Sequence, residues 1–274
     1  MINKPKLLHK ALNSNPSKEK AGAIHLSEIA PTVLRLGQEL NMNLSDNLLG
    51  SAGKKTFSGD IDLAILIEDK DIFVEKLTDC PSVIDVQRPG VISALTKIQN
   101  YDPNIPCDYY RSGYVQIDFM IGDVNWLKTY YHSPSDTESK YKGAFRNIMI
   151  AAICLEHERI ASKEKLQDGR AIREERWMFS PRDGLVRVER TPIPKSIGQG
   201  YTKKNKNQII EGPYRNLDAI AKKLKLDSPK DLNSYESLKS AVVKNYRQDQ
   251  VQKIFDNFVN DTSVIKMGIP EDLK

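Results

Sequence analysis

The sequence predicts a mixed fold of helices and strands (α/β or α+β). Two apolar runs, IDLAILI at 61–67 and YVQIDFMI at 114–121, are rich in β-branched and aromatic residues, which is typical of strands in a sheet. Segments with a helical spacing of apolar residues lie between and beyond them. The 274 residues suffice for one large domain or two small ones. We therefore expect a sheet-bearing part followed by a mostly helical part.

The N-terminal segment is basic and polar. Residues 1–20 hold five lysines against one acidic residue, and residues 1–24 are expected to form a flexible basic arm. A helix should follow, with Pro31 in its first turn. Its buried face is expected to consist of Ile29, Val33, Leu36 and Leu40.

The central segment, residues 25–138, is predicted to form the sheet-bearing domain. Beyond the two strong strands, weaker strands are expected at 83–87 and 91–96, with a helix as the alternative for the run VISALTKI that begins at residue 91. A short helix at 71–79 precedes these two strands. Strands with interspersed helices indicate a sheet covered by helices.

From residue 139 onward the apolar period becomes helical. A long amphipathic helix is predicted from Phe145, Ile148, Met149, Ala152 and Leu155. Turn-forming residues at 181–184 followed by the alternating run LVRVER predict a β-hairpin near 176–193. Residues 194–207 are predicted to be an exposed loop. The part spanning residues 139–274 is therefore expected to be mostly helical.

Composition and charge exclude several classes of protein. No apolar run is long enough to span a bilayer, and the N-terminal residues lack the apolar segment of a signal peptide. Three widely separated cysteines exclude a disulfide framework and a paired-cysteine zinc site, so a cytoplasmic location is expected. The net charge is +5, and residues 195–215 are strongly basic, which favours polyanionic partners.

Two carboxylates stand out in the first strong strand. Asp60 and Asp62 are two residues apart, so strand alternation places both on one face of the sheet. Neighbouring carboxylates repel unless a cation neutralises them, and a hard divalent cation is the natural partner. Asp118 lies between Ile117 and Phe119 in the second strong strand. An ionised aspartate there also needs a partner or a metal.

Small residues precede these carboxylates in a pattern suited to phosphate binding. Small side chains let backbone N–H groups approach a phosphate, and lysines add charge. The candidates are Gly50, Ser51, Gly53, Lys54, Lys55, Ser58 and Gly59. A P-loop is excluded, because Leu48 occupies its first glycine position and Lys55 its Ser/Thr position.

The run of Gly50-Ser51, eight residues, and then Asp60-Ile61-Asp62 in an apolar strand resembles the signature of the nucleotidyltransferase superfamily. Ser58-Gly59 and the basic pair after Gly53 make the chain most similar to the DNA polymerase beta branch, in a compact, phage-type form. The resemblance implies a nucleotidyltransferase-type palm with a mixed β-sheet and a third carboxylate on a neighbouring strand, which Asp118 fits.

The resemblance also implies an activity. A nucleoside monophosphate would pass from an NTP, ATP among them, to an acceptor hydroxyl, with release of pyrophosphate. Asp60, Asp62 and Asp118 would bind two Mg²⁺ ions, for which Mn²⁺ is an alternative. The triphosphate would be held by Gly50, Ser51, Ser58 and Gly59, assisted by Lys54 or Lys55.

A later segment bears a looser likeness to the same branch. Residues 139–147, SKYKGAFRN, resemble the nucleotide-binding helix that follows the palm, which makes Tyr141 and Lys142 candidate nucleotide contacts. Lys140 and Arg146 are further candidates for contact with phosphates. Alternatively, Phe145 belongs to the core and the cations form a solvated face.

The acceptor is left open by the sequence. The basic arm and the lysines at 203–206 favour a nucleic-acid 3′ end, whereas small-molecule and protein hydroxyls are alternatives. A different class of function is a catalytically silent module of the same fold that binds nucleic acid or a protein partner. The intact set of Asp60, Asp62 and Asp118 favours the enzyme.

Overall fold

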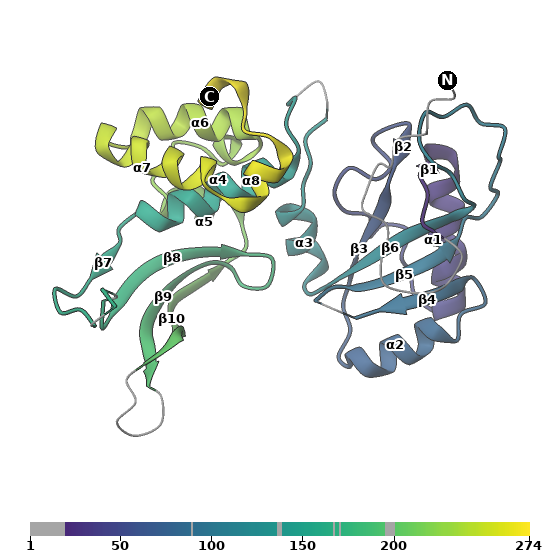
Figure 1. Ribbon diagram of the computed structural model, residues 1–274, viewed down its shortest axis with the longest axis horizontal. Helices are drawn as coiled ribbons and strands as arrows, with labels where there is room; N and C mark the ends of the chain where they lie inside the picture. The colour runs from purple at the N-terminus through teal and green to yellow at the C-terminus, as the bar shows by residue number, and fades with distance from the viewer. Residues whose placement is uncertain (1–19, 89, 136–138, 167, 170, 195–200) are drawn as a thin grey trace. The chain divides into compact units, whose positions relative to one another are not determined.

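The computed structural model describes residues 20–88, 90–135, 139–166, 168–169, 171–194 and 201–274 (Figure 1). The chain divides into two compact units, Met1–Ser133 and Pro134–Lys274, called here unit 1 and unit 2. Most of the expected basic arm lies outside the described residues. Its last residues are packed rather than free: Ala23 and Ile24 are buried, and Gly22 N donates to the carbonyl of Tyr114 at 2.8 Å.

Unit 1 contains a four-stranded mixed sheet in the order β3-β6-β5-β4. β3 (Asp60–Ile65) runs parallel to β6 (Tyr114–Ile121). β5 (Ile92–Lys97) is antiparallel both to β6 and to β4 (Val83–Gln87). All four predicted strands are confirmed, with bounds that differ by two residues at most.

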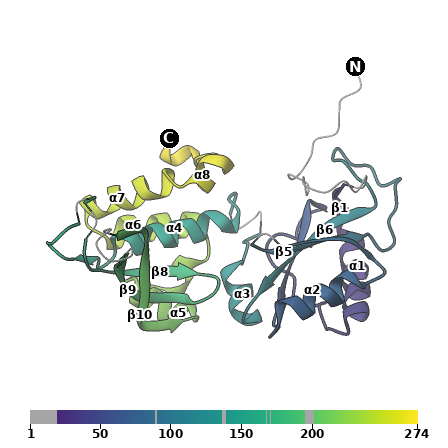
Figure 2. The same ribbon diagram turned by 60° about the horizontal axis from the view of Figure 1, so that its bottom comes forward.

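Two helices cover one face of this sheet. α1 (Leu26–Leu40) and α2 (Lys70–Thr78) lie on the same side of it (Figure 2). The predicted stripe of α1 is buried in a core shared with the sheet, where Phe73 of α2 and Phe119 of β6 meet edge to face at 5.1 Å. The carboxylate-bearing side of β3 and β6 faces away from these helices.

The start of α1 differs from the prediction, because Pro31 lies inside the helix rather than in its first turn. His25 and Glu28 form a capping box that starts the helix at Leu26. β1 (Ile24–His25) pairs antiparallel with β2 (Phe57–Ser58), which lies just before β3. α3 (Val124–Tyr130), a short helix that was not predicted, follows β6.

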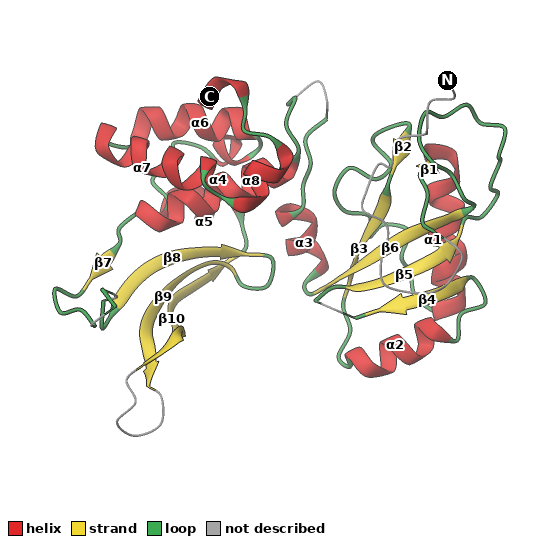
Figure 3. Ribbon diagram, in the orientation of Figure 1, coloured by secondary structure: helices red, strands yellow, loops and turns green. Residues whose placement is uncertain are grey.

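Unit 2 contains a second sheet, which is antiparallel and ordered β10-β9-β8-β7 (Figure 3). β8 (Glu174–Ser180) and β9 (Gly184–Pro194) form the predicted hairpin, and β7 (Ile160–Ala161) pairs with β8. The predicted loop at 194–207 is wrong for its described residues from 201 onward, because β10 (Tyr201–Tyr214) pairs with β9. Backbone pairing with β9 outweighs the polar, lysine-rich composition that suggested a loop.

α4 (Gly143–Glu156) is the central helix of unit 2 and contacts β8, α6 and α7. The surrounding helices are α5 (Leu217–Lys223), α6 (Tyr235–Asn245), α7 (Gln248–Val259) and α8 (Thr262–Met267). Two 3₁₀ helices, η1 (Pro229–Leu232) and η2 (Glu271–Leu273), complete the unit. Among its described residues, helical residues therefore outnumber strand residues, and the four-stranded sheet extends the predicted hairpin.

The predicted mixed fold is confirmed: the described residues form a mixed α+β structure with eight α-helices and a mixed sheet. Among the described residues, no helix has both the length and the apolar character needed to cross a membrane.

Candidate active site

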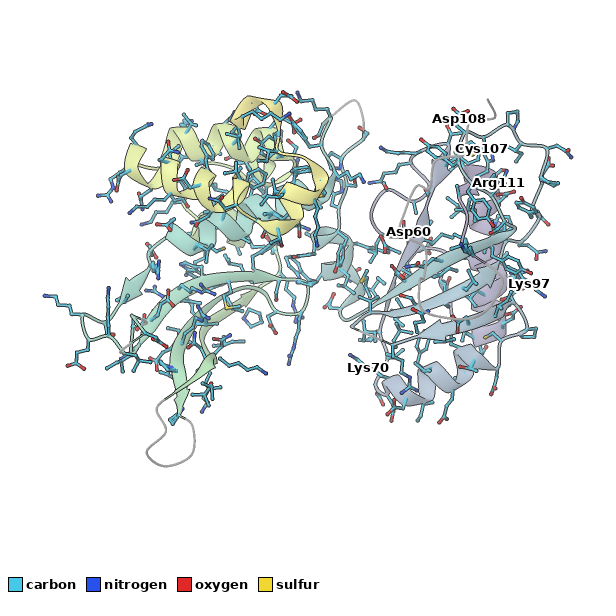
Figure 4. The ribbon with its side chains drawn as sticks, viewed as in Figure 1. Asp60, Lys70, Lys97, Cys107, Asp108 and Arg111 are labelled. Carbon is cyan, nitrogen blue, oxygen red and sulfur yellow. The ribbon has the colours of Figure 1, made fainter. Side chains whose placement is uncertain are left out.

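Three aspartates lie on one face of the unit 1 sheet. In the parallel pairing of β3 with β6, Asp62 is directly opposite Asp118 and Asp60 is opposite Gln116. The alternate residues Ile61 and Ile117 point into the core and are fully buried. Asp118 follows Asp60 by 58 residues in the sequence. The parallel register nevertheless brings the three carboxylates together in one patch near the start of β3, where Figure 4 labels Asp60.

The patch is electrostatically crowded. Burial, followed by the charges of Asp60 and Asp118, raises the pKa of Asp62 to about 7. Asp118 Oδ1 accepts a hydrogen bond of 2.8 Å from Gln116 Nε2. At neutral pH the Asp62 carboxyl is thus partly protonated, and a bound cation would favour its ionised form.

Residues 50–59, which contain the predicted phosphate-binding residues, are called here the phosphate cradle. The segment before the cradle runs along the edge of β3. Leu49 N donates to the carbonyl of Asp62 at 2.9 Å, and Ala64 N donates to the carbonyl of Asn47 at 2.8 Å. These bonds bring Gly50 against Asp62. Gly50 has a φ of +64°, and a Cβ at this position would lie 3.2 Å from Asp62 Oδ2. The first residue of the predicted phosphate cradle therefore lies next to the Asp62 carboxylate, with no room for a larger side chain.

Gly50→Ala is expected to destabilise unit 1 by about 1–2 kcal/mol, because it adds left-handed backbone strain and crowds Asp62. Gly53→Ala is the matched control. Gly53 has a similar φ of +80°, but the nearest atom to its Cβ would be Leu48 Cδ1 at 4.0 Å. Urea unfolding of both variants measures the difference. Equal losses of stability would show that the contact with Asp62 has no energetic weight.

The middle of the cradle forms a turn. Lys54 N donates to the carbonyl of Ser51 at 3.1 Å, and Lys54 Nζ donates to the carbonyl of Ser133. Lys55 is exposed. The contact between Lys54 and Ser133 was not foreseeable from local sequence, since the two residues are 79 positions apart.

The end of the cradle is held by a buried ion pair. Arg111 Nη2 donates to both carboxylate oxygens of Glu28, at 2.5 and 2.7 Å. The Arg111 guanidinium also lies 5.7 Å from the ring centre of Phe57. Phe57 precedes Ser58, whose hydroxyl is buried and has no hydrogen-bond partner among the described residues. A donor that is already desolvated and unpaired therefore lies two residues before Asp60.

The structure places the remaining predicted contacts in unit 2. Lys142 is the exposed N-cap residue of α4. Tyr141 Oη donates to Asp272 Oδ1 at 3.1 Å, and its ring packs against Tyr235 at 4.8 Å. Arg146 is only 1% exposed, so the suggestion that it contacts phosphates is wrong for this structure. The helical phase of α4 directs Arg146 into the interior of unit 2, together with Phe145.

The donor chemistry suits a hard divalent cation, since the patch offers carboxylate oxygens and no softer ligand. However, no group of three or more His, Cys, Asp or Glu side chains in the described part of the chain is arranged to hold a metal ion. Asp118 is instead bonded to Gln116. Strand alternation predicts that Gln116 lies on this face, but it does not predict the hydrogen bond from Gln116 to Asp118.

Comparison with known proteins gives a limited result. No protein family model matches the chain. No curated protein matches it either. Among solved structures, polymerase beta from Leishmania infantum in a ternary gap complex is 14% identical, with a TM-score of 0.36, over 86% of this chain and 67% of that chain. A likeness at this level defines no family for the chain.

Proposed function

We propose that the protein is a nucleotidyltransferase, which transfers a nucleoside monophosphate from an NTP to an acceptor hydroxyl and releases pyrophosphate. The observation that carries this proposal is the register of β3 and β6. It sets Asp62 opposite Asp118 and beside Asp60, with the glycine that opens the cradle against Asp62 Oδ2. A carboxylate cluster adjoining a phosphate cradle is suited to triphosphate chemistry.

Asp60, Asp62 and Asp118 would bind two Mg²⁺ ions, or two Mn²⁺ ions in their place. The raised pKa of Asp62, caused by burial and by two neighbouring carboxylates, is the feature of this chain that fits a cation. When bound, such ions neutralise phosphate charge and lower the pKa of a coordinated hydroxyl. Asp118 would exchange its bond to Gln116 for this role.

The other groups of the site would bind and orient the substrate. Backbone N–H groups of Gly50, Ser51 and Gly59 and the hydroxyl of Ser58 would hold the β- and γ-phosphates, with Lys54 or Lys55 supplying charge. The acceptor oxygen would form a bond to the α-phosphorus as the bond to the pyrophosphate oxygen breaks. The proton of the acceptor hydroxyl would leave that oxygen next to the Asp118 carboxylate. Catalysis of this kind depends on in-line positioning and charge stabilisation.

The proposed acceptor is a nucleic-acid 3′ end, on the basis of the exposed Lys204 and Lys206 of β10. Tyr141 and Lys142 are proposed to contact the nucleotide. The second candidate is a catalytically silent module that binds nucleic acid or a protein. Two observations favour that alternative. Asp118 is hydrogen-bonded to Gln116, and among the described residues no group of three potential metal ligands is arranged to hold an ion.

Incubating the pure protein with Mg²⁺, each labelled NTP, and tRNA, DNA or cell extract tests the proposal. We expect one acceptor class to become labelled and pyrophosphate to be released. Asp60→Asn/Asp62→Asn is the inactive control, because it removes two carboxylates while preserving side-chain size. Binding of nucleic acid with no transfer to any acceptor would support the silent module instead.

Lys204→Ala/Lys206→Ala is expected to weaken nucleic-acid binding and to reduce the slope of log K against log salt by up to about two units, because each lysine would neutralise one phosphate. Lys225→Ala/Lys244→Ala removes the same charge from exposed lysines elsewhere in unit 2 and is the control. Fluorescence anisotropy over a salt series measures both slopes. An unaltered slope in the first variant would favour a small-molecule acceptor.

A further inference from the structure

A polar cavity lies on the sheet of unit 2. It has a volume of about 490 Å³ and is lined by residues that include Arg159, Lys165, Glu174, Arg190 and Asn205. The lining residues lie in the segment 159–171 after α4, on β8 and β9, and on β10. Nothing in the proposed transfer reaction uses this cavity.

One carboxylate in the cavity is shared by two guanidinium groups. Glu174 is directly opposite Arg190 in the pairing of β8 with β9. Arg159 Nε donates to Glu174 Oε1 at 2.7 Å, and Arg190 Nη1 donates to Glu174 Oε2 at 3.3 Å. The side chain of Glu174 is 13% exposed, so both arginines share one nearly buried acid. Arg190 Nε also donates to Asn207 Oδ1 at 3.2 Å.

A third arginine lies on the same face without an acid of its own. Arg176 is two residues beyond Glu174 on β8, and strand alternation gives the two side chains the same face. Arg176 Nε is buried and has no hydrogen-bond partner among the described residues. Burial and the charge of Arg190 lower the pKa of Arg176, with a smaller contribution from Arg159, and the charge of Glu174 opposes this shift.

The cluster therefore has a deficit of negative charge. Three guanidinium groups lie around one carboxylate: Arg159 and Arg190 line the cavity, and Arg176 lies close enough to interact with their charges. The other charged residues of the lining, Lys165 and Asp168, offset each other. Planar guanidinium groups donate two parallel hydrogen bonds to phosphate oxygens. A bound phosphate would accept hydrogen bonds from the arginines that line the cavity and would balance the excess charge of the cluster.

We propose that this cavity binds a phosphate group of the nucleic-acid acceptor strand. The inference rests on the proposed function, because that function supplies the strand. Position favours a strand over a free anion. Asn205 of β10 lines the cavity, and β10 is an edge strand of the sheet. Strand alternation places the exposed Lys204 and Lys206 on the other face of β10, so a nucleic-acid strand that passes around this edge meets positive charge on both faces.

Binding of a short labelled single-stranded oligonucleotide, without NTP or metal, tests the site. Arg190→Gln and Arg159→Gln are each expected to weaken binding about tenfold and to reduce the salt slope by nearly one unit, since each removes one phosphate partner that lines the cavity. Arg182→Gln is the matched control. The side chain of Arg182 is 90% exposed in the same unit, and its charge lies outside the cavity. This control should bind as the wild type does.

Two further arms distinguish the source of the phosphate. An oligonucleotide with an uncharged methylphosphonate backbone should bind all the proteins equally weakly. Inorganic phosphate and pyrophosphate should compete only at high concentration. If they bind tightly to the wild type and not to Arg190→Gln, while oligonucleotide binding is unchanged, the cavity is a free-anion site and the assignment to a strand is overturned.

A folding check keeps the test decisive. Lys165→Gln changes an exposed lining residue and is the second variant if a buried arginine variant fails to fold, with a few-fold loss of binding expected. If every cavity variant that folds binds the oligonucleotide as the wild type does, the arginines form an internal ion-pair cluster and the proposal is wrong. Because the assay contains no NTP, a protein that binds in this way but transfers nothing would contradict the proposed function and leave the phosphate site standing.

Discussion

Replacing Asp118 with asparagine is expected to lower the rate of nucleotidyl transfer about 100-fold or more, a cost near 3 kcal/mol, while NTP binding in the presence of Mg²⁺ changes by only a few-fold. Asp118 lies on β6 and is proposed to act beside the acceptor hydroxyl. An interaction made mainly in the transition state appears in the rate rather than in ground-state affinity. Asparagine keeps the size of the side chain and can still pair with Gln116, so the fold should be preserved.

Asp62→Asn is the informative comparison. Asp62 is the half-buried carboxylate next to Gly50, between the proposed metal ligands and the proposed phosphate cradle, so its loss should impair both NTP binding and turnover. Titration calorimetry with a non-hydrolysable NTP and single-turnover assays measure the two effects separately. Asp46→Asn, which changes an exposed aspartate of the same unit, is the control. If Asp118→Asn transfers at the wild-type rate, Asp118 is a structural acid; if Asp62→Asn does so as well, the proposed function is wrong.

The sheet of unit 1 was predictable because its strands carry their own signals. Apolar alternation located β3 and β6, and it also assigned Asp60 and Asp62 to one face, since side chains alternate with period two. Alternation does not say which strands are neighbours. The pairing of Asp62 with Asp118 is a long-range contact, and the structure was needed to show it.

The failures have physical causes of the same kind. β10 is polar and rich in lysine, and its strand conformation comes from pairing with β9 rather than from its own composition. Arg146 lies in an amphipathic helix whose phase is set by packing within unit 2, and this packing buries a charge that the sequence would place at a surface. The bonds of Gln116 to Asp118 and of Lys54 to Ser133 likewise depend on tertiary structure. Composition and local pattern therefore pointed to the carboxylate cluster but not to its hydrogen bonds.

The stability of unit 1 is expected to decrease as the pH rises from about 4 to about 7. Burial and the charges of Asp60 and Asp118 raise the pKa of Asp62 from 3.8 to about 7, so the folded state holds a proton that the unfolded state releases over this interval. The free energy of unfolding therefore falls with pH in this range and levels off above it. Asp62→Asn abolishes the dependence and should stabilise the protein at pH 8 by about 2–4 kcal/mol, with little effect below pH 4.

Tryptophan fluorescence reports this effect for unit 1 alone. The chain has two tryptophans, and Trp177 belongs to unit 2, so a Trp177→Phe background leaves buried Trp126 as the reporter during urea unfolding. Asp46→Asn in the same background should follow the wild-type pH profile. Because a cation favours the ionised form of Asp62, Mg²⁺ at pH 8 should stabilise the parent protein and not Asp62→Asn. If the difference in unfolding free energy between the parent and Asp62→Asn does not change with pH, the pKa of Asp62 is not raised in the folded state. If Mg²⁺ stabilises both proteins equally, the cation binds elsewhere.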